Sequence, residues 1–249
     1  MLRSPEVFRS EILDVVGKIM WEEPHALTIF YDKHMSYEGA KVFALEHCVF
    51  AKFFPRWFGN IVGNCPHLEA RQYLIENMYV EEVSDPTVER GHYETMVDFA
   101  VALGFDSDFV RDYKGAIYTR MAIAYWDGAS RTKPWLEAFA AIGGLEASKN
   151  LEVAKRYGTE RFTDRRRFEG LDLPPEALAH WGSADAADLS EGGHANETVN
   201  ILTRYATSED TQNAVLESLE ESLQIFRYRY HQIGKSAIEA SNSIEAPKN

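Results

Sequence analysis

Residues 76–92 constrain the fold most, because they describe the end of one helix, a turn, and the start of another. Glu82 follows the apolar residues before it at helical spacing, which predicts that it lies on the inward face of its helix. The sequence Ser84-Asp85-Pro86 then breaks the helix, since a proline disfavours helical geometry at the residue before it. His92 is the only ionisable member of the next apolar stripe. A carboxylate and an imidazole are therefore expected to face inward from neighbouring helices, which is costly unless they pair or bind a metal.

The rest of the chain shows the same helical periodicity and no strand pattern. Gly143-Gly144 interrupts one helix, and we expect it to mark either a close approach to the backbone or a tight helix crossing. Together the segments predict one all-α domain over residues 1–249, with seven or eight helices and a frayed tail at 241–249. The expected helices cover 5–20, 36–61, 67–82, 87–103, 107–126, 134–157, a segment from about 184, and a last helix from about 207.

Three more of these helices carry ionisable residues on an apolar stripe. Glu46 and Glu146 each fall in the middle of one, and Glu191 and His194 are three residues apart and so share a face. Carboxylates and imidazoles that project into a bundle core typically hold two irons or manganeses. Two divalent cations would also balance four carboxylates, which otherwise repel one another. The alternative for any single residue is that the glutamate reaches solvent or that the histidine is an ordinary core residue.

Composition excludes several other functions. A net charge of −13 argues against a nucleic-acid or anionic-membrane partner. No apolar run approaches ~18 residues, so no transmembrane helix is expected. Two cysteines form no disulfide framework and suit a reducing compartment, so we expect a cytoplasmic protein. Phosphate-binding glycine loops and the Gly-x-Ser-x-Gly nucleophile turn are also missing from the sequence.

Several short segments follow one another in an order that carries a family resemblance. They are Ala44-Leu45-Glu46-His47, Phe54-Pro55-Arg56, Glu76-Asn77 through Glu81-Glu82, and His92 ahead of an aromatic-rich helix that ends at Ala102-Leu103-Gly104. In this order the chain resembles the haem-oxygenase-like diiron oxidase and oxygenase group, over about residues 36–232. That group includes N-oxygenases and is allied in fold to the thiaminase-like and PQQ-synthesis C proteins.

The resemblance implies a haem-oxygenase-like seven- to eight-helix bundle with two Fe²⁺ ions that activate O2. The last motif of the group, His-x-x-x-Asp-x-x-His, is matched here by Ala187, Glu191 and His194, so the first histidine is replaced. A shifted register would use Asp188 with Glu191 and also lacks a histidine, so a metal-poor or metal-free relative stays open. The implied metal ligands are Glu46, Glu82, His92, Glu146, Glu191 and His194, with Asp188 as the alternative.

The expected function is therefore that of a diiron enzyme that oxidises a small organic substrate with O2. The resemblance suggests N-oxygenation, desaturation or oxidative C–C cleavage of an amine, an amino acid or a fatty acid. The alternatives are a metal-free thiaminase-like or PQQ-synthesis-C-like enzyme, or a small-molecule-binding module with a degenerate metal site. We expect no nucleic-acid or membrane partner, and a homodimer stays open as the oligomeric state.

Overall fold

The computed structural model describes residues 1–159, 165–182 and 193–245. These residues form helices and no strand, which confirms the all-α prediction. The elements are α1 (Pro5–Met20), α2 (Ala26–Lys33), α3 (Tyr37–Asn64), α4 (Leu68–Glu82), α5 (His92–Ala102), α6 (Ser107–Asp112), α7 (Ile117–Thr132), α8 (Trp135–Ala147), α9 (Leu151–Tyr157), the 3₁₀ helices η1 (Arg165–Leu171) and η2 (Pro175–Leu178), α11 (His194–Tyr205) and α12 (Glu209–Glu245).

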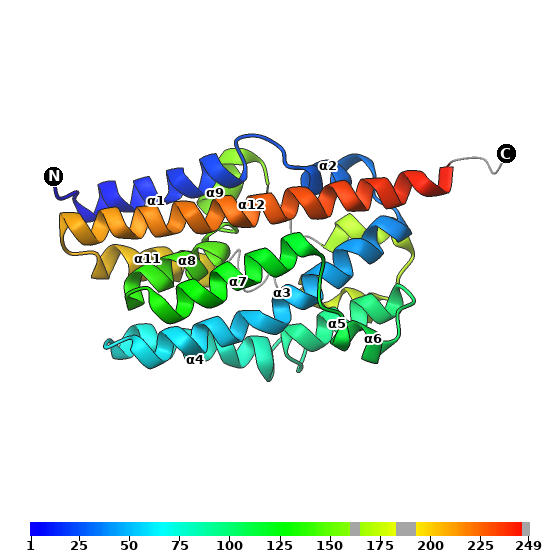
Figure 1. Ribbon diagram of the computed structural model, residues 1–249, viewed down its shortest axis with the longest axis horizontal. Coiled ribbons are helices and arrows are strands. Elements are labelled where there is room, and N and C mark those ends of the chain that lie inside the picture. The colour runs from blue at the N-terminus through cyan, green and yellow to red at the C-terminus, as the bar shows by residue number, and fades with distance from the viewer. Residues whose placement is uncertain (160–164, 183–192, 246–249) are drawn as a thin grey trace.

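Helix α12 runs along the whole length of the molecule (Figure 1). Its 37 residues span about 55 Å at 1.5 Å per residue. It packs against α1, α2, α3 and α8. The crossing with α2 brings two backbones together, because a Cβ atom at Gly234 would lie 2.0 Å from the backbone nitrogen of Leu27. Only glycine fits at that crossing.

Helix α8 lies inside the bundle and packs against α7, α11 and α12. From Ala138 to Ala147 every residue of it is buried, and most are alanine or glycine. A Cβ atom at Gly143 would lie 2.8 Å from the Thr198 side chain of α11, and one at Gly144 would lie 2.4 Å from Leu219 of α12. The glycine pair therefore marks a tight helix crossing, which is one of the two explanations that the sequence left open.

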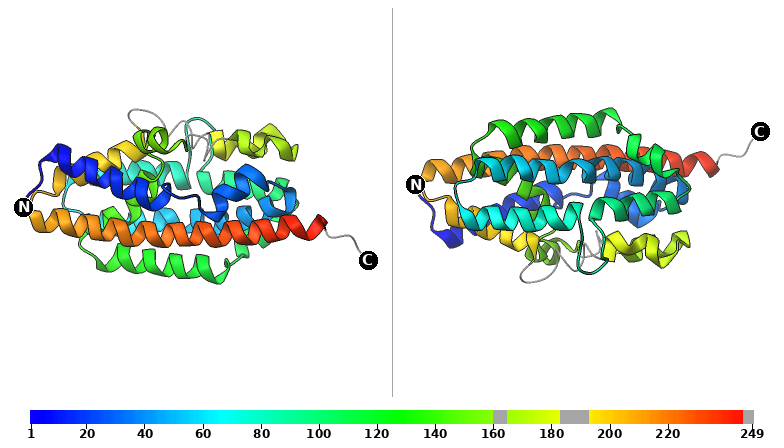
Figure 2. Two further views of the ribbon diagram at one scale, coloured as in Figure 1. Left: turned by 90° about the horizontal axis from the view of Figure 1, so that it is seen from above. Right: turned by 90° about the horizontal axis from the view of Figure 1, so that it is seen from below.

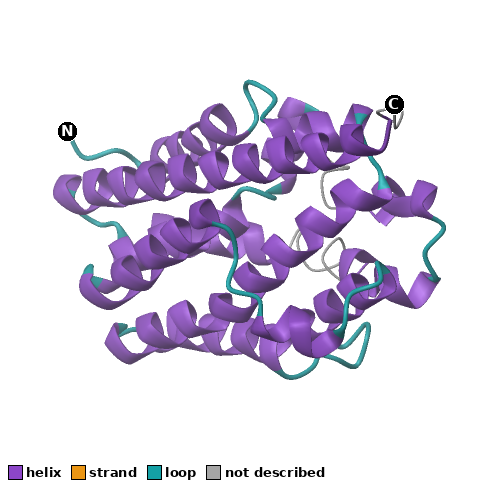
Figure 3. Ribbon diagram, turned by 45° about the vertical axis from the view of Figure 1, so that its right-hand side comes forward, coloured by secondary structure: helices purple, strands orange, loops and turns teal. Residues whose placement is uncertain are grey.

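The remaining helices are arranged on both sides of α3 and α12. Helix α7 lies on one side and residues 165–182 lie on the opposite side (Figure 2). Helices α4 and α5 lie end to end and both pack along α3 (Figure 2), and α7 also packs against α3. Figure 3 shows the described residues as helices joined by loops. Across the described ranges, no helix is both long enough and apolar enough to cross a membrane.

Two of the expected helices are each divided into two in the structure. The expected helix 107–126 is two helices, α6 and α7, because the chain turns between them at Gly115, whose φ of +79° favours glycine. The expected helix 134–157 divides into α8 and α9, and the side chain of Asn150 caps the start of α9. Helix α5 begins at His92 and not at 87, and α2 was not expected at all.

The Gly234 crossing gives a stability prediction. Replacing Gly234 with Ala places a methyl group against the α2 backbone, so we expect the free energy of unfolding to fall by about 1–3 kcal/mol. Gly128 is the matched control, because it also lies in a helix and nothing lies within 4 Å of an added Cβ atom. Gly128→Ala should be neutral or stabilising by up to about 1 kcal/mol. Urea denaturation of both variants tests this, and equal effects would contradict it.

Candidate functional site

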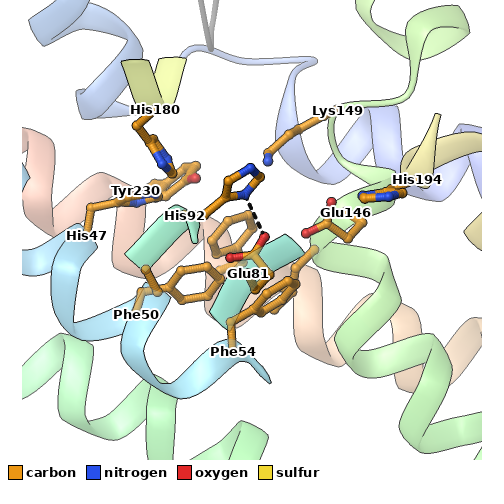
Figure 4. Close-up of a pocket in the computed structure, with 13 residues that line it drawn as sticks. His47, Phe50, Phe54, Glu81, His92, Glu146, Lys149, His180, His194 and Tyr230 are labelled. Carbon is orange, nitrogen blue, oxygen red and sulfur yellow. Dashed lines mark hydrogen bonds and ion pairs between the residues drawn. The ribbon is translucent and has the colours of Figure 1, made fainter. Parts of the chain in front are cut away.

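A small buried cavity lies where α3, α4, α5, α8, α11 and α12 meet (Figure 4). The volume open to the centres of water molecules is ≈ 50 Å³, which is room for a few waters or a small ligand group. The cavity wall combines aromatic and small apolar side chains with carboxylates, imidazoles and one lysine. The lining residues are His47, Phe50, Ala51, Phe54, Glu81, His92, Leu145, Glu146, Lys149, His180, His194, Phe226 and Tyr230.

His92 is held at the cavity by the turn between α4 and α5. At Gly91 the two chain segments touch, since an added Cβ atom would lie 2.8 Å from the carbonyl oxygen of Glu81. This contact sets the first residue of α5 beside the last turn of α4. The Nδ1 atom of His92 lies 3.0 Å from Glu81 Oε1, and its Nε2 atom lies 2.8 Å from Asp85 Oδ2. The imidazole is thus clamped between two carboxylates.

The two carboxylates decide the charge of His92. Burial alone would lower the pKa of His92, but the negative charges and hydrogen bonds of Glu81 and Asp85 together raise that pKa to about 9. The burial of Asp85 would raise its own pKa, but hydrogen bonds donated by Thr87 and His92 hold it below the ordinary value. His92 is therefore a charged imidazolium at neutral pH in the metal-free chain, and it donates to both carboxylates.

Two other histidines of the cavity are neutral. His180 is buried and His47 is largely buried, and desolvation holds the pKa of each ring well below its usual value. Their ring centres lie 5.7 Å apart. The Nδ1 atom of His47 has no hydrogen-bond partner, although it is buried. A neutral imidazole nitrogen is a good metal ligand, so both rings are in the protonation state that metal binding requires.

Glu146 and His194 approach the cavity from α8 and α11. Glu146 follows the glycine pair of α8 by one half-turn and is 6% exposed. His194 is the first residue of α11. The hydroxyl group of Tyr73 holds this end of α11 against α4, because it donates to the carbonyl oxygen of His194 at 2.9 Å and lies 2.8 Å from the hydroxyl oxygen of Thr198. Both predicted residues therefore line the cavity, together with His92.

Glu82 and Glu46 do not line this cavity. Glu82 is exposed, and its neighbour Glu81 occupies the inward position. The predicted stripe of α4 was wrong by one residue, because α4 carries large apolar residues on its outer face too: Ile75 is 52% exposed and Tyr79 is 55% exposed. The buried face of α4 is formed by Ala70, Tyr73, Leu74 and Asn77.

Glu46 is buried, as predicted, but it serves a different contact. Its carboxylate accepts a hydrogen bond of 2.7 Å from the Tyr113 hydroxyl and one of 3.0 Å from the backbone N–H of Ala116, at the start of α7. The next residue, His47, lines the cavity instead. The structure thus brings Glu146 to the cavity and Glu46 to the α6–α7 connection. Asp188 and Glu191, the remaining predicted ligands, lie outside the described residues, as does Ala187.

The sequence interpretation also missed side chains that line the cavity or contact His92. Glu81, His47, His180, Lys149 and Asp85 were not proposed. Glu81 and His47 each adjoin a residue that was proposed, so a stripe shifted by one position would have found them. Asp85 lay in the recognised Ser-Asp-Pro turn, and His180 lay in a segment without a clear helical pattern. Lys149 lay within the expected helix 134–157 but was not assigned to its apolar stripe.

The carboxylate and imidazole side chains of the cavity are of the types that bind iron, although they do not surround one common point. Carboxylate and imidazole ligands together favour non-haem iron. Among the described side chains, no three of His, Cys, Asp or Glu are close enough together to hold a metal ion. Glu81, His92, Glu146, His180 and His194 nevertheless line the same cavity.

The fold and the cavity define a class: a haem-oxygenase-like helical bundle with carboxylates and imidazoles at its centre. The sequence pattern of a family described as iron-containing redox enzymes matches residues 41–227. The chain belongs to this family of iron-containing redox enzymes, and the resemblance inferred from the sequence is confirmed.

Known proteins that are similar to the chain agree with this assignment. A 4-aminobenzoate synthase from Chlamydia muridarum is 24% identical over 219 residues, which cover 84% of this chain and 82% of that protein. A protein of unknown function with a haem-oxygenase-like fold from Shewanella denitrificans superposes with a TM-score of 0.69 at 15% identity, over 95% of this chain and 94% of that one. A TenA homologue from Pseudomonas syringae has a TM-score of 0.66 at 13% identity, over 93% and 92%. The two structures show the fold alone.

The clamp on His92 predicts a pH-dependent stability in the iron-free protein. Because the folded pKa of about 9 lies above the ordinary histidine value of about 6.5, the stabilisation is complete below about pH 6.5 and is lost as the pH rises through 9. His92→Gln should therefore cost more stability at about pH 6 than at about pH 9.5. Asp85→Asn keeps the ring but removes one carboxylate, so it should lower the pKa of His92 in an NMR titration. A pKa near 6.5 for His92 itself in the unmodified protein would contradict the clamp.

The contacts of Glu46 predict a structural role. Glu46→Ala leaves the Ala116 N–H and the Tyr113 hydroxyl without their acceptor, so we expect the free energy of unfolding to fall by about 1–3 kcal/mol. Tyr113→Phe removes one of the two hydrogen bonds and should cost less. Iron binding should survive in both variants. If Glu46→Ala lost iron but kept its stability, the structural role would be wrong and Glu46 would be a metal ligand.

Proposed function

We propose that the chain is a non-haem iron oxidoreductase that uses O2 to oxidise a small organic substrate. The observation that carries this proposal is the convergence of Glu81, His92, Glu146 and His194 on one buried cavity from four different helices. The family is described as iron-containing redox enzymes, which supports the assignment of the metal. Iron bound there would supply one-electron redox chemistry with O2.

Two irons are part of the proposal. His47 and His180 add two neutral imidazoles to the four residues above, so six donors line the cavity. The family resemblance adds Glu191, with Asp188 as the alternative. If Glu81 and His92 held iron, the imidazole would be neutral, because a ligating imidazole carries no charge, and no charged imidazolium would then be buried. The Asp85 carboxylate would then accept a hydrogen bond from the other ring nitrogen, which is the usual partner of a metal-bound histidine.

The cavity wall narrows the substrate class. The cavity is also lined by the aromatic side chains of Phe50, Phe54, Phe226 and Tyr230, beside the carboxylates and imidazoles. Such a wall would contact the apolar group beside the reacting atoms of an amine, an amino acid or a fatty acid and exclude water from those atoms. The relative from Chlamydia is named for the synthesis of 4-aminobenzoate, an aromatic amine, and a flat ring suits this wall. N-oxygenation, desaturation and oxidative C–C cleavage all remain within the proposal.

One observation favours a metal-free enzyme as the competing proposal. Both ring nitrogens of His92 are engaged, by Glu81 and by Asp85, whereas a metal ligand must offer one nitrogen. A chain that keeps this clamp in solution would use His92 as a fixed cation, in a fold that is also similar to a TenA homologue. Measured iron content separates the two proposals.

The decisive experiment compares two adjacent glutamates. The purified chain is reconstituted with Fe(II) without oxygen, and the bound iron is counted by elemental analysis. Glu81→Gln should weaken iron binding by at least about tenfold, because it removes a carboxylate from the cavity. Glu82→Gln makes the same substitution at an exposed position, and this variant should bind iron as the unmodified chain does.

Circular dichroism should show unchanged helicity in both variants. Loss of iron in Glu82→Gln with retention in Glu81→Gln would overturn the placement of the site. Failure of the unmodified chain to bind iron would overturn the proposed function and favour the metal-free enzyme.

A further inference from the structure

A second hollow lies on the outside of the bundle, between α3 and α7. Its volume is ≈ 510 Å³, which falls in the range of small-molecule sites. Val49, Phe53 and Ile123 provide apolar surface within it. On α3, the residues that line this groove alternate with those that line the buried cavity, so the two sites use different faces of one helix.

The groove is positively charged on a strongly acidic chain. The cations that line it are Lys52, Arg56, Lys114, Arg120 and Arg131, and Asp127 is the only carboxylate among the described residues that line it. The chain as a whole carries a net charge of −13. A concentration of cations against that background sets up a local field that attracts anions, and the concave shape with apolar walls strengthens it.

Existing contacts leave most of this charge uncompensated. The Arg131 guanidinium pairs with Asp127 at 3.1 Å. The Lys52 ammonium donates to the carbonyl oxygen of Arg111, and Arg120 donates to that of Gly115, each at 2.7 Å. Neutral carbonyl groups orient these side chains but do not cancel their charge.

Arg56 lies over the Phe53 ring, 5.1 Å from its centre, which also leaves its charge in place. Within the described part of the chain, neither Arg56 nor Lys114 forms an ion pair. Both side chains are exposed at the groove. They are therefore available to an anionic group that enters it.

We propose that this groove binds an amphipathic anion, a molecule with a carboxylate or phosphate headgroup and an apolar body. The cations would hold the headgroup, and the surface of Val49, Phe53 and Ile123 would cover the body. The site is distinct from the iron cavity and does not depend on the proposed function. Its occupant would also contact Tyr113, whose hydroxyl donates to Glu46 at the α6–α7 connection. Binding should therefore raise the melting temperature, as any ligand of the folded state does.

The test uses the iron-free protein, three probes that share a ten-carbon chain, and acetate. Isothermal titration calorimetry compares decanoate and decyl phosphate, which carry the two headgroups, with decyltrimethylammonium and acetate. At least one of the two anionic probes should bind and raise the melting temperature, and the comparison between them identifies the headgroup. Decyltrimethylammonium lacks the negative charge and acetate lacks the body, so both should bind at least about tenfold more weakly. Equal binding of acetate and decanoate, or no binding of either anionic probe, would overturn the proposal.

Variants place the ligand in the groove. Arg56→Glu combined with Lys114→Glu should weaken binding of the anionic probe by at least about tenfold. Lys18→Glu combined with Lys155→Glu is the matched control, because it makes the same change in net charge at exposed positions on α1 and α9. Should the first pair fail to fold, Arg56→Gln with Lys114→Gln gives a smaller loss on the same prediction. Equal binding in the groove and control variants would place the ligand elsewhere, the buried cavity included, and would overturn the site.

Discussion

The close packing around α8 is the constraint on which the rest of the structure depends. Helices α7, α11 and α12 all pack against it, and its small side chains leave no room for a larger residue at Gly143 or Gly144. Because the helices approach so closely there, α8 delivers Glu146 to the centre of the bundle. The same approach brings the start of α11, with His194, to the cavity. The Glu146 carboxylate reaches the interior because the backbone of α8 itself lies inside the bundle.

Helical periodicity was enough to predict the fold class and most of the helices, but the facing of individual residues was less certain. His92 and Glu146 were placed correctly for physical reasons that differ. Every residue of α8 from Ala138 onward is buried, so no choice of face was needed for Glu146. His92 follows directly from the turn that ends α4. In α4 and α3 the choice of face mattered, because apolar residues lie on more than one side of each helix. Adjacent helical residues point about 100° apart, so an error of one position changes the face on which a residue lies. Glu82 was therefore predicted where Glu81 lines the cavity, and Glu46 was predicted where His47 does.

The breaks within helices were also beyond a periodicity argument. Apolar spacing continues across residues 113–116 and 148–150, although the backbone turns there. Gly115 and Asn150 carry the local signals for these turns, a left-handed glycine and a helix N-cap. Each signal is weak alone, since glycine and asparagine also occur inside helices. The tertiary contacts decide, and the carboxylate of Glu46 that accepts the Ala116 N–H is one of them.

Glu46 shows why an inward carboxylate is weak evidence for a metal. Arg229 of α12 is fully buried, and its guanidinium donates to the carbonyl oxygen of Glu46 at 2.6 Å and to the Thr119 hydroxyl at 3.3 Å. Burial lowers the pKa of Arg229, and the nearby negative charge of Glu46 acts in the opposite direction. A buried cation needs a compensating anion close by, and Glu46 supplies that charge while it caps the start of α7. The bundle therefore balances charge in two separate places: Glu46 with Arg229 between α3, α7 and α12, and the carboxylates with the imidazoles in the cavity. Counting inward carboxylates combined these two places into one site, and only the second offers the imidazoles that iron requires.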